Sequence, residues 1–278
     1  MSAVLRSRGA ERPIALRTRG YRHGPITRLV SPSDIGELIK PFVFLDLFDI
    51  SEATAPTFGW HPHSGIATLT VVHEGAIEYE ETTGVKGILP ADGIEWMRAG
   101  GGVWHTGAAL QQAKGFQLWI ALPEELENLP SQSQYLSAHQ VAEEKPARVI
   151  LGSYGRAKSA ILSPARINYL DVQLAAGERW TYQPPLDHEV AWLAVSVGTI
   201  HTPEPVSAGE FVAFEESNSA LSIRAERASR FVLGSAAKHP HDLVLGRYSV
   251  HTTHAALAAG ESQIQRIGNQ LVAAGLLR

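Results

Sequence analysis

Short hydrophobic runs, broken by glycine and proline, recur along almost the whole chain. The runs are rich in Val, Ile, Thr, Trp and Tyr, which β-strands favour, and the residues between them are typical of turns. Several short strands with regular turn signals indicate an all-β sandwich or barrel. The expected strands cover residues 66–72, 76–79, 116–122, 167–174, 191–197, 211–214 and 230–234.

Helical patterns are few. We expect one short helical turn at residues 34–39, with Ser33 or Asp34 as its cap. A longer pattern covers residues 253–274, where apolar side chains recur near helical spacing. Gly260 lies inside this second pattern and favours a break there, which would leave residues 261–271 as the firmer part of the helix.

The two halves of the chain share a short internal repeat. Gly75 aligns with Gly198, and Ile94 aligns with Phe211. Each unit consists of a strand, a glycine turn, a strand, a Gly/Pro corner and another strand. This arrangement suits a small closed barrel, because glycine relieves strain where strands turn corners. The repeat therefore predicts two similar barrels in tandem.

A polar segment separates the two halves of the repeat. Residues 123–145 are rich in Gln, Glu and Ser and are helix-prone, and we place the inter-domain linker near their end, around residues 143–147. The sequence thus predicts an N-terminal barrel at residues 1–145. A C-terminal barrel with a short terminal helix follows at residues 146–278. A chain of 278 residues suits two domains of ordinary size.

Composition and charge exclude several classes of protein. The 24 basic and 28 acidic residues give a net charge of −4, which argues against direct binding of nucleic acid. The chain has no cysteine, so disulfides, zinc–thiolate sites and thiol nucleophiles are excluded. No run approaches the roughly 18 apolar residues that a membrane-spanning helix needs. We therefore expect a soluble, cytoplasmic protein with no membrane partner.

Three histidines have the spacing of a metal site. His61 and His63 are two residues apart, so on an extended strand their imidazoles lie on one face. About forty residues later, a run of three glycines leads to His105. One strand–turn–strand excursion separates them, which allows the third histidine to return beside the first pair. The pattern predicts a site for a divalent metal, with a surface pair as the alternative.

The second half of the chain lacks equivalent ligands. The offset of the repeat brings the three histidines onto Pro184, Leu186 and Ser222. His188 lies nearby, but alone it is interpreted as a structural or surface histidine. We therefore expect a single metal site, in the first barrel.

Other polar and aromatic residues near the histidines are candidates for the site. Glu95 lies in the strand before the glycine run and is a candidate acid, base or partner of the ligands, with a surface position as the alternative. Gln117 alternates with apolar neighbours and is a candidate for an inward-facing polar group. Trp104 and Trp119 would suit a pocket for a flat aromatic substrate, although core packing explains them as well.

Five segments of the sequence are distinctive: residues 42–48 (FVFLDLF), 61–65 (HPHSG), 92–100 (DGIEWMRAG), 116–123 (FQLWIALP) and 246–250 (GRYSV). Together they resemble the pirin family, a branch of the bicupins in the cupin superfamily. The match is strongest from Phe42 to Pro123, covers nearly the whole chain, and weakens in the second half. The resemblance implies two tandem cupin barrels packed face to face, with one metal, usually iron, in the N-terminal barrel.

The family pattern implies three histidines and one glutamate as ligands. The histidines carry over to His61, His63 and His105, but the expected glutamate position is occupied by Gly107. An acidic residue that commonly follows the HPH motif is replaced by Ala67. Three neutral imidazoles would leave a divalent metal its full charge and open positions, so such a site favours an anionic or bidentate oxygen ligand.

The resemblance implies two classes of function. One is a dioxygenase that acts on a flavonol such as quercetin, with a small aromatic substrate at the metal. The other is a non-catalytic, redox-responsive regulatory protein that binds a protein partner. A metal-free member kept as a scaffold is a third alternative. The expected metal is iron(II), with manganese, nickel, copper or zinc as alternatives, in a monomer or weak homo-oligomer.

Overall fold

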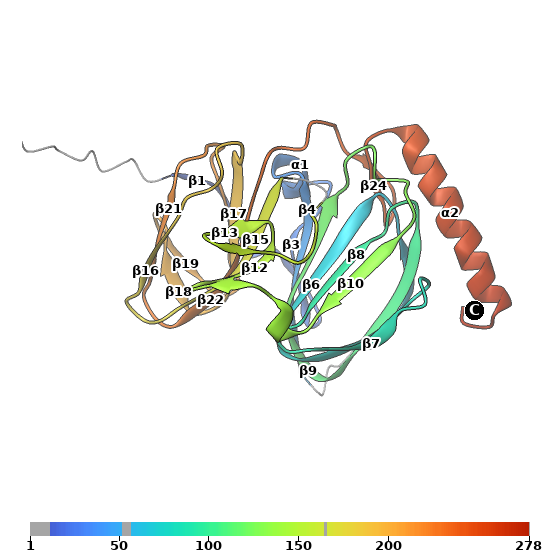
Figure 1. Ribbon diagram of the computed structural model, residues 1–278, viewed down its shortest axis with the longest axis horizontal. Helices are drawn as coiled ribbons and strands as arrows, with labels where there is room; N and C mark the ends of the chain where they lie inside the picture. The colour runs from blue at the N-terminus through green and yellow to red at the C-terminus, as the bar shows by residue number, and fades with distance from the viewer. Residues whose placement is uncertain (1–11, 52–56, 164–165, 278) are drawn as a thin grey trace, which may run out of the picture.

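The computed structural model describes residues 12–51, 57–163 and 166–277, and β-strands make up most of its regular structure. The strands form two barrels side by side, and the C-terminal helix α2 (His254–Ala273) lies on the outer side of the first barrel (Figure 1). The predicted all-β fold of two tandem barrels with a terminal helix is confirmed.

The first barrel is built on a nine-stranded sheet. Its main path runs β10-β8-β6-β9-β4-β3-β2, and β5 pairs with β9 while β7 pairs with β6. The strands are β2 (Tyr21–His23), β3 (Ile26–Val30), β4 (Phe42–Ile50), β5 (Thr57–His63), β6 (Ile66–Glu81), β7 (Lys86–Pro90), β8 (Ile94–Arg98), β9 (Val103–Ala121) and β10 (Gln132–Leu136).

The second barrel combines a seven-stranded sheet, in the order β1-β20-β17-β22-β15-β12-β11, with a four-stranded sheet, β16-β21-β18-β19. Two small hairpins, β13-β14 and β23-β24, complete the strands. The bounds are β1 (Ile14–Thr18), β11 (Glu143–Glu144), β12 (Ala147–Leu151), β13 (Ser153–Tyr154), β14 (Ala157–Lys158), β15 (Ile167–Leu174), β16 (Arg179–Tyr182), β17 (Val190–Val197), β18 (Thr199–His201), β19 (Pro205–Ser207), β20 (Phe211–Phe214), β21 (Leu221–Ala225), β22 (Ser229–Ala236), β23 (Val244–Leu245) and β24 (Val250–His251).

The first described strand, β1, belongs to the second barrel. It pairs antiparallel with β20, far away in the sequence. Just before it, the Arg12 guanidinium donates hydrogen bonds to the carbonyl oxygens of Glu215 (2.7 Å) and Glu189 (2.5 Å). At the expected linker, β11 pairs with β12. The division into residues 1–145 and 146–278 stays a prediction.

Residues 66–72 and 76–79, expected as two strands, are parts of the single long strand β6. The strand bends where its register with β9 shifts, on either side of Glu74 and Gly75. Gly75 has a φ of 79°, and a Cβ built there would lie 1.7 Å from the carbonyl oxygen of Gln112. Only glycine fits such a bulge, so the expected turn is a bend in a continuous strand.

The expected short helix is α1 (Ile35–Leu38), whose start is capped by the side chain of Asp34. The expected break at Gly260 is wrong, because α2 continues through it. A Cβ at Gly260 would lie 2.5 Å from the Ser64 hydroxyl oxygen, so glycine here lets the helix approach the barrel closely. Neither described helix is long and apolar enough to cross a membrane.

The helical preference assigned to residues 123–145 is largely wrong. Within this segment, β10 pairs along its whole length with β8, and only the short 3-10 helix η2 (Ala138–Gln140) is helical. The backbone hydrogen bonds that β8 offers override a weak local preference for helix.

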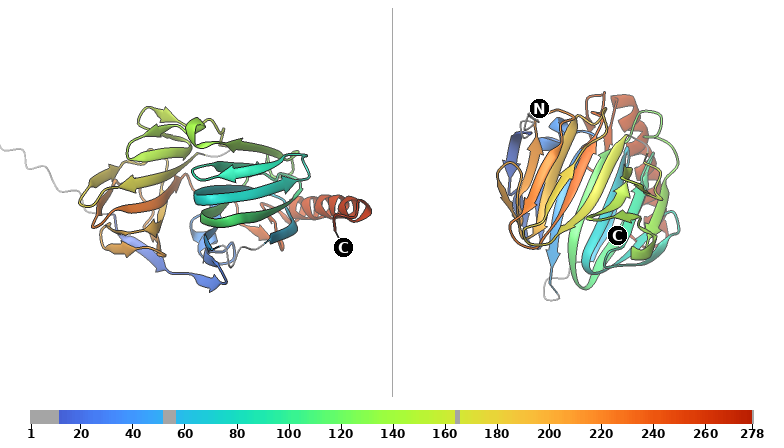
Figure 2. Two further views of the ribbon diagram at one scale, coloured as in Figure 1. Left: turned by 90° about the horizontal axis from the view of Figure 1, so that it is seen from below. Right: turned by 60° about the vertical axis from the view of Figure 1, so that its left-hand side comes forward.

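A large hydrophobic core lies between the two barrels. It combines side chains of the first barrel, such as Phe42 and Leu69, with side chains of the second, such as Tyr169 and Trp192. The ring of Phe42 meets Trp192 edge-on at 5.3 Å. The two sheets therefore pack face to face, as the views in Figure 2 show from two further directions.

Candidate metal centre

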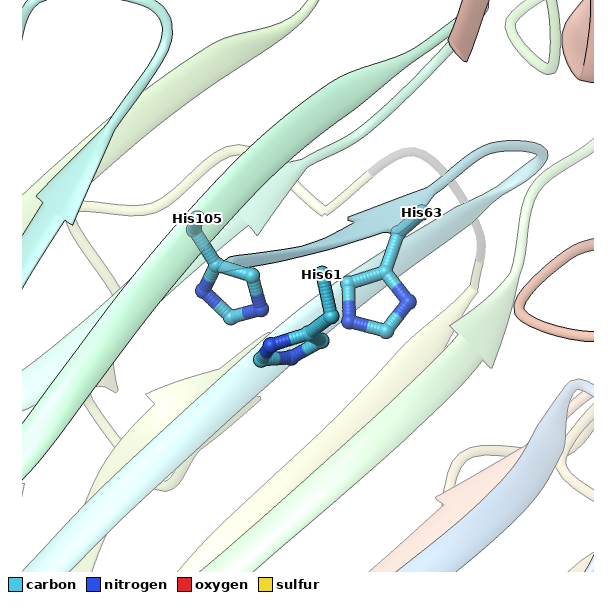
Figure 3. Close-up of side chains that lie close together, drawn as sticks. All are labelled: His61, His63 and His105. Atoms are coloured by element: carbon cyan, nitrogen blue, oxygen red, sulfur yellow. The ribbon is translucent and has the colours of Figure 1, made fainter. Parts of the chain in front are cut away.

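The structure brings the three predicted histidines together. His61 and His63 come from β5 and His105 from β9, and the antiparallel pairing places His61 opposite His105. The alternation of side chains along β5 puts His61 and His63 on one face. One ring nitrogen from each histidine lies within 4.8 Å of the other two. The three rings point toward one another (Figure 3).

Hydrogen bonds orient two of the rings. The Nδ1–H of His61 donates to the carbonyl oxygen of Gly59 at 2.8 Å, and that of His63 donates to the carbonyl oxygen of Tyr248 at 3.2 Å. A proton fixed on Nδ1 leaves Nε2 with a free lone pair, which is how proteins present histidine to a metal. In the described part of the chain, the buried Nε2 of His105 has no hydrogen-bond partner.

Burial keeps the three imidazoles neutral. Loss of hydration is the largest cause that lowers the pKa of each ring, and repulsion from neighbouring histidines adds to it at His63 and His105. The pKa of His63 falls to about 3. Because only the neutral ring can coordinate a metal, the cluster is in its binding form at neutral pH. The donor set therefore fits a divalent transition metal.

The histidines line a cavity of about 710 Å³ inside the first barrel. A second hollow of about 840 Å³ lies between α2 and the segment 128–131, and none of the three histidines lines it. We assign the candidate site to the first of these spaces, because it combines converging metal-type donors with a wall rich in aromatic side chains.

Gly107 lies two residues beyond His105 on β9 and lines the same cavity. A Cβ built there would lie 3.0 Å from the carbonyl oxygen of Glu78, so a side chain at this position needs a shift of a few tenths of an ångström. Ala67, by contrast, is fully buried in the core between the barrels. An acidic side chain at position 67 would therefore point away from the histidines, so only position 107 bears on the site.

Glu95 is buried in the cavity wall, with 6% of its surface exposed, so the surface alternative is wrong. Its carboxylate accepts a hydrogen bond from the hydroxyl of Thr70. Burial, with repulsion from Glu81, outweighs this hydrogen bond and raises the pKa of Glu95 to about 7. A carboxyl group with that pKa can both hold and release a proton near neutral pH.

The other three candidates divide between two sides of β9. Gln117 and Trp119 line the cavity, and the Trp119 ring lies 4.8 Å from the ring of His63. Trp104 does not line it, since its indole N–H donates to the carbonyl oxygen of Ile264 in α2 at 2.7 Å. Strand alternation accounts for this, because Trp104 has the opposite parity to His105.

Sequence reasoning missed several cavity-lining residues. On β4, the side chains of Phe44, Asp46 and Phe48 line the cavity. Because β4 is apolar on both faces apart from Asp46 and Asp49, its sequence has no regular alternation of polar and apolar residues that would identify the inward face. The further lining residues that were missed include Arg28, Thr70, Tyr79, Tyr135 and Tyr248.

The second barrel shows no comparable cluster in the described residues. His188 is buried and its Nδ1 lies 2.9 Å from the hydroxyl oxygen of Ser235, so it has a structural role in the second barrel. Leu186, at one position equivalent to a ligand, is 87% exposed.

Comparison with known proteins places the chain in a family. The model of the Pirin family matches residues 25–120. A putative quercetin 2,3-dioxygenase of Pseudomonas aeruginosa is 32% identical over 240 residues, which cover 79% of this chain and 82% of that protein. A pirin-like protein of Arabidopsis thaliana is 33% identical over 171 residues, 58% of this chain and about half (54%) of the plant protein.

Solved structures share the fold. Quercetin 2,3-dioxygenase from Acinetobacter baumannii superposes with a TM-score of 0.82 at 22% identity, covering 92% of this chain and 98% of that one. A bacterial pirin from Escherichia coli, solved in complex with nickel(II), gives a TM-score of 0.66 at 20% identity over 82% of this chain and 98% of the pirin. With its two barrels and its sequence relatives, the chain belongs to the pirin family of bicupins.

Proposed function

We propose that His61, His63 and His105 hold a divalent transition metal and that the protein is a dioxygenase acting on a flavonol such as quercetin. One observation carries the proposal: three neutral imidazoles converge on the wall of a cavity large enough for a small aromatic molecule. The relatives named quercetin 2,3-dioxygenase support the substrate class.

The donor set supports a metal without choosing it. Imidazole suits iron, nickel, copper and zinc, and the related Escherichia coli pirin was solved with nickel(II). We propose iron(II) as the native metal, with manganese, nickel, copper or zinc as alternatives. When bound, the metal would act as a Lewis acid that polarises adjacent oxygen atoms of the substrate.

The absence of a side chain at Gly107 is central to the proposal. We propose that Gly107 occupies the position of the glutamate ligand that the family pattern implies, so that the ligands here are imidazoles only. Glu95 then supplies a carboxylate to the same cavity, from β8 and not from a strand that carries the histidines. With its pKa raised to about 7, Glu95 is suited to exchange a proton with a substrate hydroxyl that reaches its part of the cavity wall.

Aromatic side chains complete the cavity for a flat substrate. Phe44 stacks on Trp119 with ring centroids 4.0 Å apart and planes within 7° of parallel. Phe48, Phe58 and Ile77 add apolar wall. These surfaces offer planar, apolar contacts to an aromatic ring.

An oxygen-dependence assay tests the activity. Iron-loaded protein is mixed with quercetin in air and under anaerobic conditions, and the flavonol absorbance is followed. We expect loss of absorbance only with oxygen, and only in protein that retains the metal. Unchanged absorbance in air with a fully loaded site would reject the dioxygenase and leave the metal-dependent binding protein as the alternative.

Two histidine variants test whether metal binding and turnover depend on the cavity histidines. His63→Ala removes a cavity imidazole, whereas His254→Ala removes an exposed one at the start of α2. We expect the first variant to lose both metal and turnover and the second to keep both.

A further inference from the structure

A row of polar side chains crosses the cavity wall at right angles to the strands. Asp46 on β4 lies opposite Gln117 on β9, which lies opposite Thr70 on β6. Thr70 in turn lies opposite Glu95 on β8, and Glu95 opposite Tyr135 on β10. All five line the cavity that contains the three histidines. We call Asp46, Gln117, Thr70, Glu95 and Tyr135 the polar row.

The polar row is separated from the histidines by aromatic surface. On β9, Trp119 is the next inward residue after Gln117, and its ring contacts that of His63 at 4.8 Å. The Trp119 ring also stacks on Phe44, the inward neighbour of Asp46. A planar molecule with one edge at the histidines would therefore pass these rings and place other atoms at the polar row.

Four members of the polar row already have hydrogen-bond partners. The Arg28 guanidinium donates to both carboxylate oxygens of Asp46, at 2.5 and 3.2 Å. Thr70 donates to Glu95, and the Tyr135 hydroxyl donates to Glu81 at 2.7 Å. These bonds hold the side chains in place.

Gln117, which lies between Asp46 and Thr70 in the row, differs from the other four members. Its amide makes no hydrogen bond to any described residue, and the side chain is partly open to the cavity. An amide that is covered by a ligand without a matching group loses its hydrogen bonds to water, and this loss weakens binding of that ligand. Gln117 thus discriminates between ligands that offer its amide a polar partner and those that do not.

We propose that the polar row selects planar aromatic ligands that carry hydroxyl groups remote from the atoms facing the histidines. This inference rests on the proposed function and names the part of the cavity that sets its substrate range. The Asp46 and Glu95 carboxylates and the Gln117 amide oxygen accept hydrogen bonds from phenolic hydroxyls. At about 4.8 Å between neighbouring strands, the row from Asp46 to Glu95 spans roughly 14 Å, enough for a ligand of two or three rings.

Anaerobic binding tests the inference without turnover. Quercetin and 3-hydroxyflavone share one scaffold and the hydroxyl beside the ketone, but only quercetin carries the remote hydroxyls. Each is titrated into the full-length protein as purified, and the quenching of tryptophan fluorescence gives the dissociation constant. We expect quercetin to bind about tenfold or more tightly than 3-hydroxyflavone, the value of one or two hydrogen bonds.

Gln117→Leu removes the amide at nearly constant size, and Gln111→Leu makes the same change on the exposed part of β9 as a control. Gln117→Leu should raise the dissociation constant of quercetin by roughly three- to tenfold and change that of 3-hydroxyflavone by less than about twofold. Gln111→Leu should change neither. Glu95→Gln, which keeps the shape of the side chain, should also weaken quercetin selectively and serves as the second variant.

The inference would be overturned if the protein bound the two flavonols with equal affinity or bound neither. It would also be overturned if Gln117→Leu weakened the binding of both flavonols to the same extent. A preference for quercetin without oxygen-dependent turnover would instead reject only the proposed dioxygenase. Oxygen-dependent turnover of quercetin without a binding preference over 3-hydroxyflavone would support the dioxygenase. It would reject the proposal that the polar row determines substrate selection.

Discussion

Single residues decide what the histidine cluster can do. His61, His63 and His105 supply neutral donors, and Gly107 supplies cavity space where a fourth ligand could stand. Glu95 brings a carboxylate to the same cavity from a different strand. The cavity therefore contains the Glu95 carboxylate, but this group lies on β8 and not on β5 or β9, which carry the histidines.

Restoring a carboxylate at position 107 should strengthen metal binding. Gly107→Glu places a negative charge on the cavity side of β9 beside His105, at the cost of a small shift at Glu78. We expect the metal dissociation constant to fall by about tenfold or more, as partners of metal ligands contribute at least that much. Competition with a chelator measures it, and Gly107→Gln is the uncharged control. Equal affinities for the Glu and Gln variants would mean that position 107 does not face the metal.

Glu95 should give the metal-free protein a distinctive pH dependence. Its pKa is raised from 4.5 to about 7, so the folded state holds the proton more tightly than the unfolded chain. The resulting stabilisation is complete below about pH 4.5 and is lost as the pH rises towards about 7, with an amplitude of roughly 3 kcal/mol.

Glu95→Gln should remove that slope from the free energy of unfolding, measured by denaturant titration at several pH values. Glu78→Gln, an exposed change in the same barrel, should keep it. Parallel curves for wild type and Glu95→Gln would contradict the assignment.

At the level of elements, strand alternation decides which side chains of β9 face the cavity. Its inward face carries His105, Gly107, Gln117 and Trp119, whereas Trp104 contacts α2. The sequence predicted the first histidine pair, the third histidine and most strands, because these depend on local spacing. It misplaced the helical segment at 123–145 and the break at Gly260, because the pairing with β8 and the close approach to Ser64 are tertiary contacts.

Trp104 should support α2 and leave the metal untouched. Trp104→Phe loses the hydrogen bond to the Ile264 carbonyl oxygen, and we expect a cost of about 1 kcal/mol in unfolding free energy. Hydrogen exchange should accelerate in α2, while metal content stays at the wild-type value. A folded Trp104→Phe protein that has lost its metal would show that Trp104 belongs to the site after all.

At the level of the whole molecule, the contact between barrels combines a hydrophobic core with a buried charge network. The fully buried Asp171 on β15 accepts from Arg230 at 2.6 Å and lies 3.2 Å from Arg148 and 3.3 Å from His73 of the first barrel. Asp92, also of the first barrel, accepts from Arg230 at 2.7 Å. No sequence pattern predicts this network, or the placement of β1 in the second barrel, because both depend on how the barrels meet.

Asp171 should make the association of the barrels sensitive to acid. Burial alone would raise its pKa, but the His73 ring, 3.3 Å away, and the hydrogen bonds and charge of Arg230 outweigh burial and hold the pKa below its ordinary value. The stabilisation is therefore present above about pH 4, the ordinary pKa of aspartate, and is lost as the pH falls further.

Asp171→Asn should lower the free energy of unfolding at pH 7 by roughly 3 kcal/mol or more, because two arginines lose their buried counterion. The curve against pH should also flatten below pH 4. Asp187→Asn breaks only the exposed pair with Arg166 and should cost less than about 1 kcal/mol. If Asp171→Asn and Asp187→Asn lowered the free energy of unfolding by similar amounts, the buried charge network would not contribute the stability proposed here.

Anomalous X-ray diffraction from crystals of the untagged protein, incubated with iron(II), tests the metal site most directly. The account predicts one strong anomalous peak per chain, bounded by the ring nitrogens of His61, His63 and His105, and no peak in the second barrel. A map that is flat at this position after incubation with iron(II) would contradict it.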